Sequence, residues 1–450
     1  MQHYASKYKQ HYVQILKLAG PIVAAQLGAI ITGYADTIMV GRYSTQALAA
    51  ASLVNNVFNL MILMTLGFSY GITPLIGPLH ARGDARGMGS MLRNALAANA
   101  AYAALLMAVW TALYCNLHRL GMPSELLPMV RSYYAIVLWS MVPLALINAL
   151  RQYADAVGHT SLAMWIMTAG NVMNIAGNYA LIYGRWGAPE LGLDGAGIST
   201  LAARVAMAAA FAAALLLMRR HRQATRQAMK ARTSRGEIMR VTRLSLPISM
   251  QMGMETGVFT AASLMVARLG ANTLAAYQVL VMLGSIGFMV YYAVGAAASI
   301  KIAHCCGTGD TAGVRAAAHV GYVLILACAA TASLTFVAGG RWIVAAFTPD
   351  PAVQAIALGV MWLLAAYQFG DATQVAFANA LRGIGQSMPV MRIAFVSYVA
   401  VGIPLLHVLA FTVGWGISGI YAGFVVALLM AGVLFARSFY SALRRQQRNN

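Results

Sequence analysis

The chain has 450 residues, of which 60% are hydrophobic and 9% are charged, and its formal net charge is +20. A soluble globular protein carries about 25% charged residues, so this composition excludes an ordinary soluble domain. Apolar runs of about 20 residues or more recur along the whole length, which is typical of a polytopic helical membrane protein. A transmembrane β-barrel would instead show alternating segments of about ten residues.

The distribution of the charge argues against nucleic-acid binding. Lys and Arg collect in the connections between apolar runs, and no basic stripe interleaved with aromatic residues is seen. The four cysteines form no CxxC pair, so neither a metal site nor a disulfide framework is predicted. The polar, basic residues 1–17 precede an apolar run of full length, and we predict no cleavable signal peptide.

Twelve membrane-spanning helices are predicted, which makes the fold an all-α polytopic membrane protein. In chain order they cover residues 17–41, 47–78, 90–115, 128–151, 162–184, 193–218, 243–268, 275–303, 314–338, 352–381, 389–413 and 416–438. Several exceed the roughly 20 residues that a span needs, so we expect them to tilt or to extend beyond the bilayer. We divide the chain into an N-terminal six-helix lobe (1–218), a basic linker (219–242) and a C-terminal six-helix lobe (243–450).

Basic residues define the orientation. The side that holds both termini and the even-numbered connections carries 24 Lys and Arg, against six on the other side. The positive-inside rule therefore places both termini in the cytoplasm, and we expect a bacterial inner membrane. The largest basic segment, Arg219–Arg243, contains Glu237 as its only acid. We interpret it mainly as a solvated topology signal, with contact to anionic lipid headgroups as the alternative.

The two halves of the sequence resemble each other. Each repeat has an even number of spans, so the repeats run in the same direction and are related by an axis along the membrane normal. Two such lobes enclose a cleft that opens alternately to either side, which indicates a transporter more than a receptor or an enzyme. The matches at an offset of 226 include Leu18/Leu244, Pro21/Pro247, Gly83/Gly309 and Asp84/Asp310, and Gly158/Gly385 follows at 227.

Three acids lie inside apolar spans: Asp36, Glu255 and Asp371. An ionised carboxylate in hydrocarbon costs several kcal/mol unless it faces a polar cavity or a partner, so such residues mark ion or substrate pathways. Arg204 is the only basic residue well inside a predicted span and cannot neutralise all three. Asp36 corresponds to Ala262 in the other repeat, and this asymmetry predicts a different task for each lobe.

Glu255 and Asp371 are predicted to share one site. At 1.5 Å per residue from the basic end of each span, they lie about 18 Å and about 16 Å into the membrane. Gln251 shares a helical face with Glu255, while Tyr367 and Gln374 share one with Asp371. Carboxylate, phenol and amide oxygens suit Na⁺ or a proton better than a transition metal.

A second polar stripe lies on the fifth span, where Asn171, Asn174 and Asn178 fall on one face with Thr168. Asparagines hydrogen-bond across helices in membranes, so this stripe either joins helices or meets Asp36 in the first lobe.

Aromatic side chains on the eighth span offer a second kind of contact. Phe288, Tyr291 and Tyr292 present faces that suit an organic cation, with helix packing as the alternative.

Several motifs resemble one family over nearly the whole chain. They are the run from Gly33 to Arg42, the run Ala275-Ala276-Tyr277-Gln278-Val279, Asn174 to Asn178 in span 5, Gly187 to Gly192, and Tyr367-Gln368, Asp371 and Ala380 to Gly383 in span 10. In combination they are similar to the multidrug and toxic compound extrusion (MATE) family, NorM-like subgroup. This resemblance implies a monomeric membrane transporter, not an enzyme, that needs no cofactor. It would export organic cations and drugs in exchange for inward Na⁺ or H⁺.

The resemblance also implies roles for single residues. Glu255, Asp371 and Tyr367 match the cation site of the second lobe. Asp36, Asn174 and Asn178 match the first-lobe cluster that is linked to protonation, cation or substrate binding. Further candidates for substrate contacts are Gln251, Gln278 and Phe288.

Three other functions compete with drug export, of which a channel fits two pseudo-equivalent lobes less well than a transporter does. A flippase for a lipid-linked pyrophosphate precursor, or an exporter of another amphiphile, belongs to the same superfamily. Its cavity should carry Arg and Lys to hold phosphate, whereas the buried charges here are mainly acidic. A membrane-embedded enzyme is the second rival, but the sequence lacks HExxH, GxSxG and GxxxxGK[ST] motifs.

Overall fold

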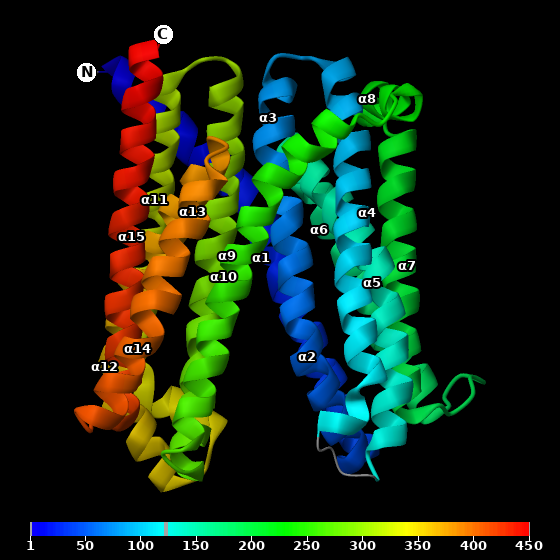
Figure 1. Cartoon of the computed structure of the whole chain (residues 1–450), viewed down its shortest axis with the longest axis vertical. Helices are drawn as coiled ribbons and strands as arrows, with labels where there is room; N and C mark the ends of the chain where they lie inside the picture. The colour runs from blue at the N-terminus through cyan, green and yellow to red at the C-terminus, as the bar shows by residue number, and fades with distance from the viewer. Residues whose placement is uncertain (1, 121–124, 450) are drawn as a thin grey trace. The chain divides into compact units, whose positions relative to one another are not determined.

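The structure is a computed structural model that describes residues 2–120 and 125–449 (Figure 1). Its contacts divide the chain into two compact units. The N-terminal unit comprises Ala24–Ser249, and the C-terminal unit comprises Met1–Val23 together with Met250–Asn450. The predicted boundary lay in the basic linker. The helices α1 (Gln2–Tyr43) and α9 (Arg235–Ala267) instead each contribute residues to both units.

The N-terminal unit is built from long helices, two of which begin at polar side-chain caps. After α1 it contains α2 (Thr45–Ser69), η1 (Tyr70–Ile72), α3 (Thr73–Ala81), α4 (Ala85–Cys115), η2 (Leu117–Leu120), α5 (Leu127–Ala156), α6 (Thr160–Tyr183), α7 (Gly192–Leu217) and α8 (Arg219–Lys230). The Ser44 side chain caps α2 by accepting a hydrogen bond from the Ala47 amide. Residues 121–124 of the connection before α5 lie outside the described residues.

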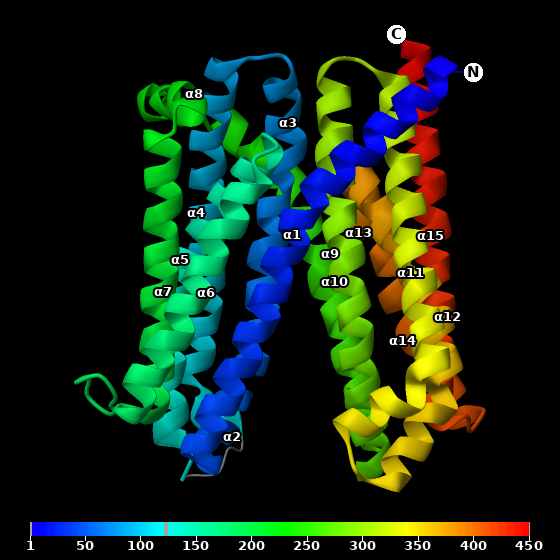
Figure 2. The ribbon, with the colours of Figure 1, turned by 180° about the vertical axis from the view of Figure 1, so that it is seen from behind.

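The C-terminal unit is arranged around one central helix. Its elements are the second part of α9, α10 (Ala271–Gly307), α11 (Thr311–Phe347), α12 (Pro351–Gly383), α13 (Ser387–Ala394), η3 (Phe395–Gly402), α14 (Ile403–His407), η4 (Val408–Thr412) and α15 (Gly416–Asn449). Helix α12 packs against α10, α11 and α15 (Figures 1 and 2). Side chains on α12 are therefore well placed to form a polar site inside this unit.

The sequence repeat is also a structural repeat. Asp84 caps α4 by accepting a hydrogen bond from Gly87 at 2.8 Å, and Asp310 caps α11 by accepting one from Gly313 at 2.7 Å. The preceding glycines, Gly83 and Gly309, have φ angles of +71° and +70°. Only glycine adopts this left-handed conformation without steric cost, which explains why the Gly-Asp pair occurs in both halves.

The prediction of an all-α membrane protein is confirmed, since helices cover all twelve predicted spans in the described residues. Ten of these helices are long and apolar enough to cross a membrane by composition alone. The two that fall outside this group are α6 and α9. Helix α6 carries the asparagine stripe, while α9 carries Gln251 and Glu255 after a basic start. The same polar residues that lower the hydropathy of these two helices are thus the candidate functional residues.

Large apolar side chains face outward as well as inward. Trp139, Trp165 and Trp342 are 66%, 67% and 79% exposed. A water-soluble protein rarely leaves so many large side chains uncovered, whereas a bilayer solvates them favourably. The exposed surface therefore fits a lipid environment.

Candidate functional site

Four polar side chains of α9 and α12 meet inside the C-terminal unit. Glu255 accepts hydrogen bonds from the Gln251 amide at 2.7 Å and from the Gln374 amide at 3.0 Å. The same Gln374 nitrogen lies 3.5 Å from an oxygen of Asp371. Gln251, Asp371 and Gln374 are each 1% exposed, and Glu255 is half-buried. The structure therefore brings the two carboxylates to one amide group, as their matching depth predicts.

A buried arginine extends this cluster. Arg382 on α12 is 4% exposed and donates hydrogen bonds to the Gln251 side-chain oxygen, to the Tyr292 hydroxyl at 3.1 Å and to the Asn379 oxygen at 3.4 Å. From the sequence, Arg382 was assigned to the membrane edge and to a family motif but not to the site, and Arg204 was predicted to be the sole basic residue well inside a span. Arg382 follows Asp371 by eleven residues, which at 3.6 residues per turn places both on one helical face. That spacing is the signal that could have assigned Arg382 to the site.

A π-helical segment adjoins the cluster. Tyr398, on η3, is 3% exposed, and the charges of Glu255, Asp371 and Arg382 act on its hydroxyl. π-Helical turns occur frequently at functional sites, and here the Ile403 amide donates to the Tyr398 carbonyl five residues earlier. Tyr398 was not predicted as a site residue. It lies in an apolar run followed by Pro404, and such a run gives only a weak indication of the irregular helix that positions this side chain.

Three oxygens of this region have no hydrogen-bond partner among the described residues. They are the second carboxylate oxygen of Asp371, the side-chain oxygen of Gln374 and the hydroxyl oxygen of Tyr398. Buried polar atoms are nearly always paired, so each unpaired oxygen needs a physical explanation. A set of carboxylate, amide and phenol oxygens fits a small hard cation, a proton or water as the missing partner.

The other predicted residues of the C-terminal unit lie at different distances from this cluster. Tyr367 is 6% exposed and packs its ring against Tyr421 and Phe424, with centroids 6.4 Å and 6.2 Å away, while its hydroxyl is under the influence of both carboxylates. The Phe288 ring lies 5.6 Å from that of Tyr292, which binds Arg382. Gln278 is exposed on α10, and the structure does not bring it to the cluster within the described residues.

The N-terminal unit contains a smaller polar cluster around Asp36. Asn178 donates a hydrogen bond to Asp36. With its amide nitrogen facing the same carboxylate, Asn174 donates to it at 3.0 Å while its oxygen accepts from the Thr200 hydroxyl at 3.1 Å. The predicted meeting between Asp36 and the asparagine stripe therefore occurs, and it joins α1, α6 and α7.

Arg204 forms its side-chain hydrogen bond outside the Asp36 cluster. Its guanidinium donates to the Ser140 hydroxyl of α5 at 2.6 Å, although its charge still acts on Asp36. Neutral amides thus supply the direct donors to all the intramembrane carboxylates described above. Amide donors leave the negative charge of a carboxylate available to a mobile cation, whereas a direct ion pair would cancel it.

Comparison with known proteins agrees with this arrangement. The MatE family model matches residues 21–180 and 247–408, which are two segments that begin 226 residues apart. A probable multidrug resistance protein NorM from Xanthomonas axonopodis pv. citri is 28% identical over 432 residues, covering 95% of this chain and 93% of its own length. The multidrug resistance protein PmpM from Pseudomonas aeruginosa is 30% identical over 456 residues, covering 97% and 93%.

Solved structures share the fold at lower sequence identity. A MOP superfamily transporter from Pyrococcus furiosus superposes with a TM-score of 0.88 at 16% identity, with 97% of each chain covered. The eukaryotic MATE transporter AtDTX14 gives 0.85 at 16% identity, with 98% of this chain and 99% of its own covered. Because the family model and the relatives span both repeats, the chain belongs to the MatE family of membrane transporters.

Proposed function

We propose that this protein is a secondary active multidrug antiporter, which exports organic cations and drugs in exchange for inward Na⁺ or H⁺. The observation that carries the proposal is the pair of carboxylates, Glu255 and Asp371, that shares the Gln374 amide in the interior of the C-terminal unit. The relatives named as multidrug resistance proteins support drugs as the substrate class.

The chemistry of this pair favours reversible cation binding. Two negative charges in a medium of low dielectric constant repel each other and lose their hydration, so the pair gains free energy when a cation or proton neutralises it. Glu255, Asp371 and Tyr367 would supply hard oxygen ligands, and the Tyr398 hydroxyl would add another. The buried guanidinium of Arg382 offsets part of the charge, which keeps binding weak enough for release.

Exchange follows if the coupling ion and the drug compete for the same negative charge. A tenfold Na⁺ gradient supplies about 1.4 kcal/mol, and each net charge moved adds about 2.3 kcal/mol per 100 mV. One Na⁺ exchanged for one monovalent drug uses only the chemical gradient, whereas two cations per drug also use the membrane potential. The parallel six-helix repeats support alternating access, and Asp36 with Asn174 and Asn178 would form a second proton or substrate site.

The charge pattern supports an orientation of the chain in the membrane. The excess of Lys and Arg in the even-numbered connections supports cytoplasmic termini, and the bacterial relatives support an inner-membrane location. We propose a monomer as the transporting unit, since one chain already contains both six-helix repeats.

Transport in vesicles tests the proposal. Purified protein in proteoliposomes should export a fluorescent organic cation when an inward Na⁺ gradient is applied at fixed pH, or when a proton gradient is applied without Na⁺. Glu255→Gln and Asp371→Asn should each lower the rate by roughly 100-fold, because about 3 kcal/mol of charge-assisted cation binding is lost. Asp350→Asn is the matched control. Asp350 caps α12, the helix that carries Asp371, at an exposed position where Asn caps equally well.

Each result has a clear meaning. Export by the wild type with one gradient and not the other identifies the coupling ion. Unchanged export by both carboxylate variants, with normal thermal unfolding, would refute the assigned cation site. Export without either gradient would refute antiport altogether.

A further inference from the structure

Helix α8 presents one face that is entirely basic at its charged positions. We call this set the basic face; its members are Arg219, Arg222, Arg226 and Lys230, all exposed and spaced so that they fall on one side of the helix. The opposite side is buried, and it contains His221, Ala224, Thr225 and Ala228. The segment is therefore a folded amphipathic helix and not only a flexible basic connection.

Close packing fixes the orientation of the basic face. A Cβ atom on Gly89 of α4 would lie 2.5 Å from the Ala224 carbonyl oxygen and 2.8 Å from the Ala228 amide, so only glycine permits this approach. Beyond α8, the fully buried Asn94 of α4 accepts a hydrogen bond from the Ser234 amide at 2.8 Å. Close contacts within α8 and just after its end therefore hold the segment against α4.

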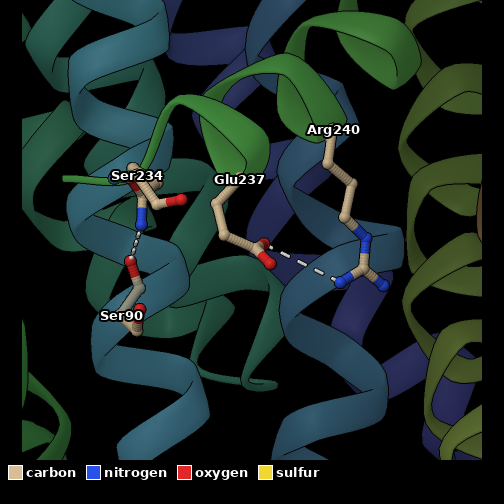
Figure 3. Close-up of polar contacts among 5 residues, drawn as sticks. Ser90, Ser234, Glu237 and Arg240 are labelled. Atoms are coloured by element: carbon tan, nitrogen blue, oxygen red, sulfur yellow. Dashed lines mark hydrogen bonds and ion pairs between the residues drawn. The ribbon is translucent and has the colours of Figure 1, made fainter.

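The charge of the segment is not neutralised within the segment. Glu237 is its only acid, and this carboxylate pairs with Arg240 at 3.7 Å, as Figure 3 shows beside Ser234. The pair belongs to the start of α9 and not to α8. The four members of the basic face are therefore left to attract an anion from outside the chain.

The segment directly follows α7 (Gly192–Leu217), a helix long and apolar enough to cross a membrane. Helix α7 ends at Leu217, which is 79% exposed, and α8 begins two residues later and lies across the ends of α4 and α7 (Figures 1 and 2). Met229, which is 60% exposed, flanks the basic face on α8. A basic face beside exposed apolar side chains is typical of helices at the boundary between headgroups and acyl chains.

We propose that the basic face binds the phosphate groups of anionic phospholipids at the membrane surface. Arginine suits this ligand, because its planar guanidinium can donate two parallel hydrogen bonds to one phosphate. A topology signal needs only positive charge in the loop, whereas fixed packing against Gly89 and Asn94 orients the charges in one direction. The partner is a lipid because headgroups are already concentrated beside Leu217 and Met229.

Lipid titration of the full-length protein tests this proposal. In an uncharged detergent, short-chain phosphatidylglycerol should bind and phosphatidylcholine should not, as followed by thermophoresis. Arg222→Gln/Arg226→Gln should weaken phosphatidylglycerol binding roughly 30-fold, at about fivefold for each basic residue near the surface. Arg222→Lys/Arg226→Lys should restore most of the affinity. Arg131→Gln/Arg185→Gln removes the same charge from two exposed but isolated positions and should have little effect.

Two outcomes would overturn the proposal. Equal binding by the Arg222→Gln/Arg226→Gln variant and the wild type would show that the basic face is a solvated topology signal. Displacement of the lipid by equimolar inorganic phosphate or by an RNA oligonucleotide would show a general anion site. Binding does not depend on transport, so the test stands even if the proposed antiport fails.

Discussion

In the N-terminal unit one carboxylate, Asp36, is held by two asparagine amides, whereas in the C-terminal unit Glu255 and Asp371 share one glutamine. The first arrangement satisfies a single charge with neutral donors. The second places two charges together and leaves one carboxylate oxygen of Asp371 buried without a partner among the described residues. Two repeats with the same helix caps therefore have different chemistry in their interiors, and we expect the C-terminal unit to bind cations more tightly, because two neighbouring carboxylates gain more from neutralisation than one.

Packing accounts for part of this difference. Asp36 corresponds in the repeat to Ala262, which is completely buried, so a carboxylate there would be both overpacked and unpaired. Glu255 corresponds to Ala29, which is exposed and offers no enclosed site. Each acid is thus placed at a position whose counterpart in the other unit could not use it.

The helices that follow the first four spans differ in the same way. Helix α6 is a regular α-helix, while its counterpart contains the π-helical segments η3 and η4 on either side of α14. At the offset of 227, Asn171 corresponds to Tyr398, but Asn178 corresponds to Leu405. At the position of Asn171, the C-terminal unit therefore has a phenol, which lies within the electrostatic influence of Glu255 and Asp371.

Among changes that test this difference between the two units, Gln251→Leu is expected to have the largest effect on stability and on cation affinity. The change removes the acceptor of a buried Arg382 and a donor of Glu255, so we expect the free energy of unfolding to fall by about 2–3 kcal/mol. Cation affinity should also change by roughly tenfold, because the carboxylate loses a donor that holds it in place. Thermal unfolding and a Na⁺ titration of drug export measure the two effects.

Gln278→Leu is the control for this change. Gln278 is exposed on α10, so its unfolding free energy should stay within about 0.5 kcal/mol of the wild type. If Gln251→Leu behaved like Gln278→Leu in both measurements, the hydrogen-bonded path from Arg382 to Glu255 would have no energetic role. The C-terminal unit would then be no more specialised than the N-terminal unit.

A smaller effect is expected from Asn178→Leu in the N-terminal unit. Asp36 loses one amide donor but keeps Asn174, so the cost should be about 1 kcal/mol, in the range of hydrogen bonds between membrane helices. Asn171→Leu on the same helix is the matched control, because its amide nitrogen is buried without a partner. A greater loss of stability for Asn171→Leu than for Asn178→Leu would contradict the Asp36 contact.

The sequence predicted most of the fold, because the signals were long and redundant. Twelve apolar runs, the matching Gly-Asp caps and the basic connections each point to the same topology. The prediction missed how the first parts of α1 and α9 are shared between units, since periodicity along one helix carries no information about which neighbour it meets. It also missed α8, whose high charge suggested a solvated linker although Ala224 and Ala228 fit closely against Gly89.

The site was predictable where polar residues interrupt apolar helices. Glu255, Asp371 and Asp36 stand out for that reason, and depth along the helix correctly paired the first two. Arg382 was harder to assign, because an arginine near the end of a span ordinarily extends to the headgroups. Tyr398 was harder still, since a tyrosine in an apolar run is usually a packing residue and the π-helical backbone that orients it is a tertiary effect.

The smallest predicted effect depends on pH and is confined to the N-terminal unit. On α8, His221 is buried, lies 2.9 Å from His159 between ring nitrogens, and packs against Tyr153. Burial, the neighbouring His159, Arg220 and His80 together lower the pKa of His221 from 6.5 to about 4. Burial and Arg220 also lower the pKa of His159. The folded N-terminal unit therefore favours the neutral form of both imidazoles.

The sign of the pH dependence follows from these shifts. Both histidines bind protons more readily in the unfolded chain, so their contribution to stability is complete above about pH 6.5 and is lost as the pH falls toward about 4. Tryptic cleavage within Arg219–Arg243, expressed relative to cleavage of an unfolded substrate at the same pH, should consequently accelerate between neutral pH and about pH 5. His221→Phe keeps an aromatic contact with Tyr153 but cannot titrate, so the acceleration should be weaker. At an offset of 227, His159 corresponds to Gln386, so cleavage at connections of the C-terminal unit should not share this pH dependence. An equal acceleration in both units would show that acid loosens the whole protein and not the histidine pair that distinguishes the N-terminal one.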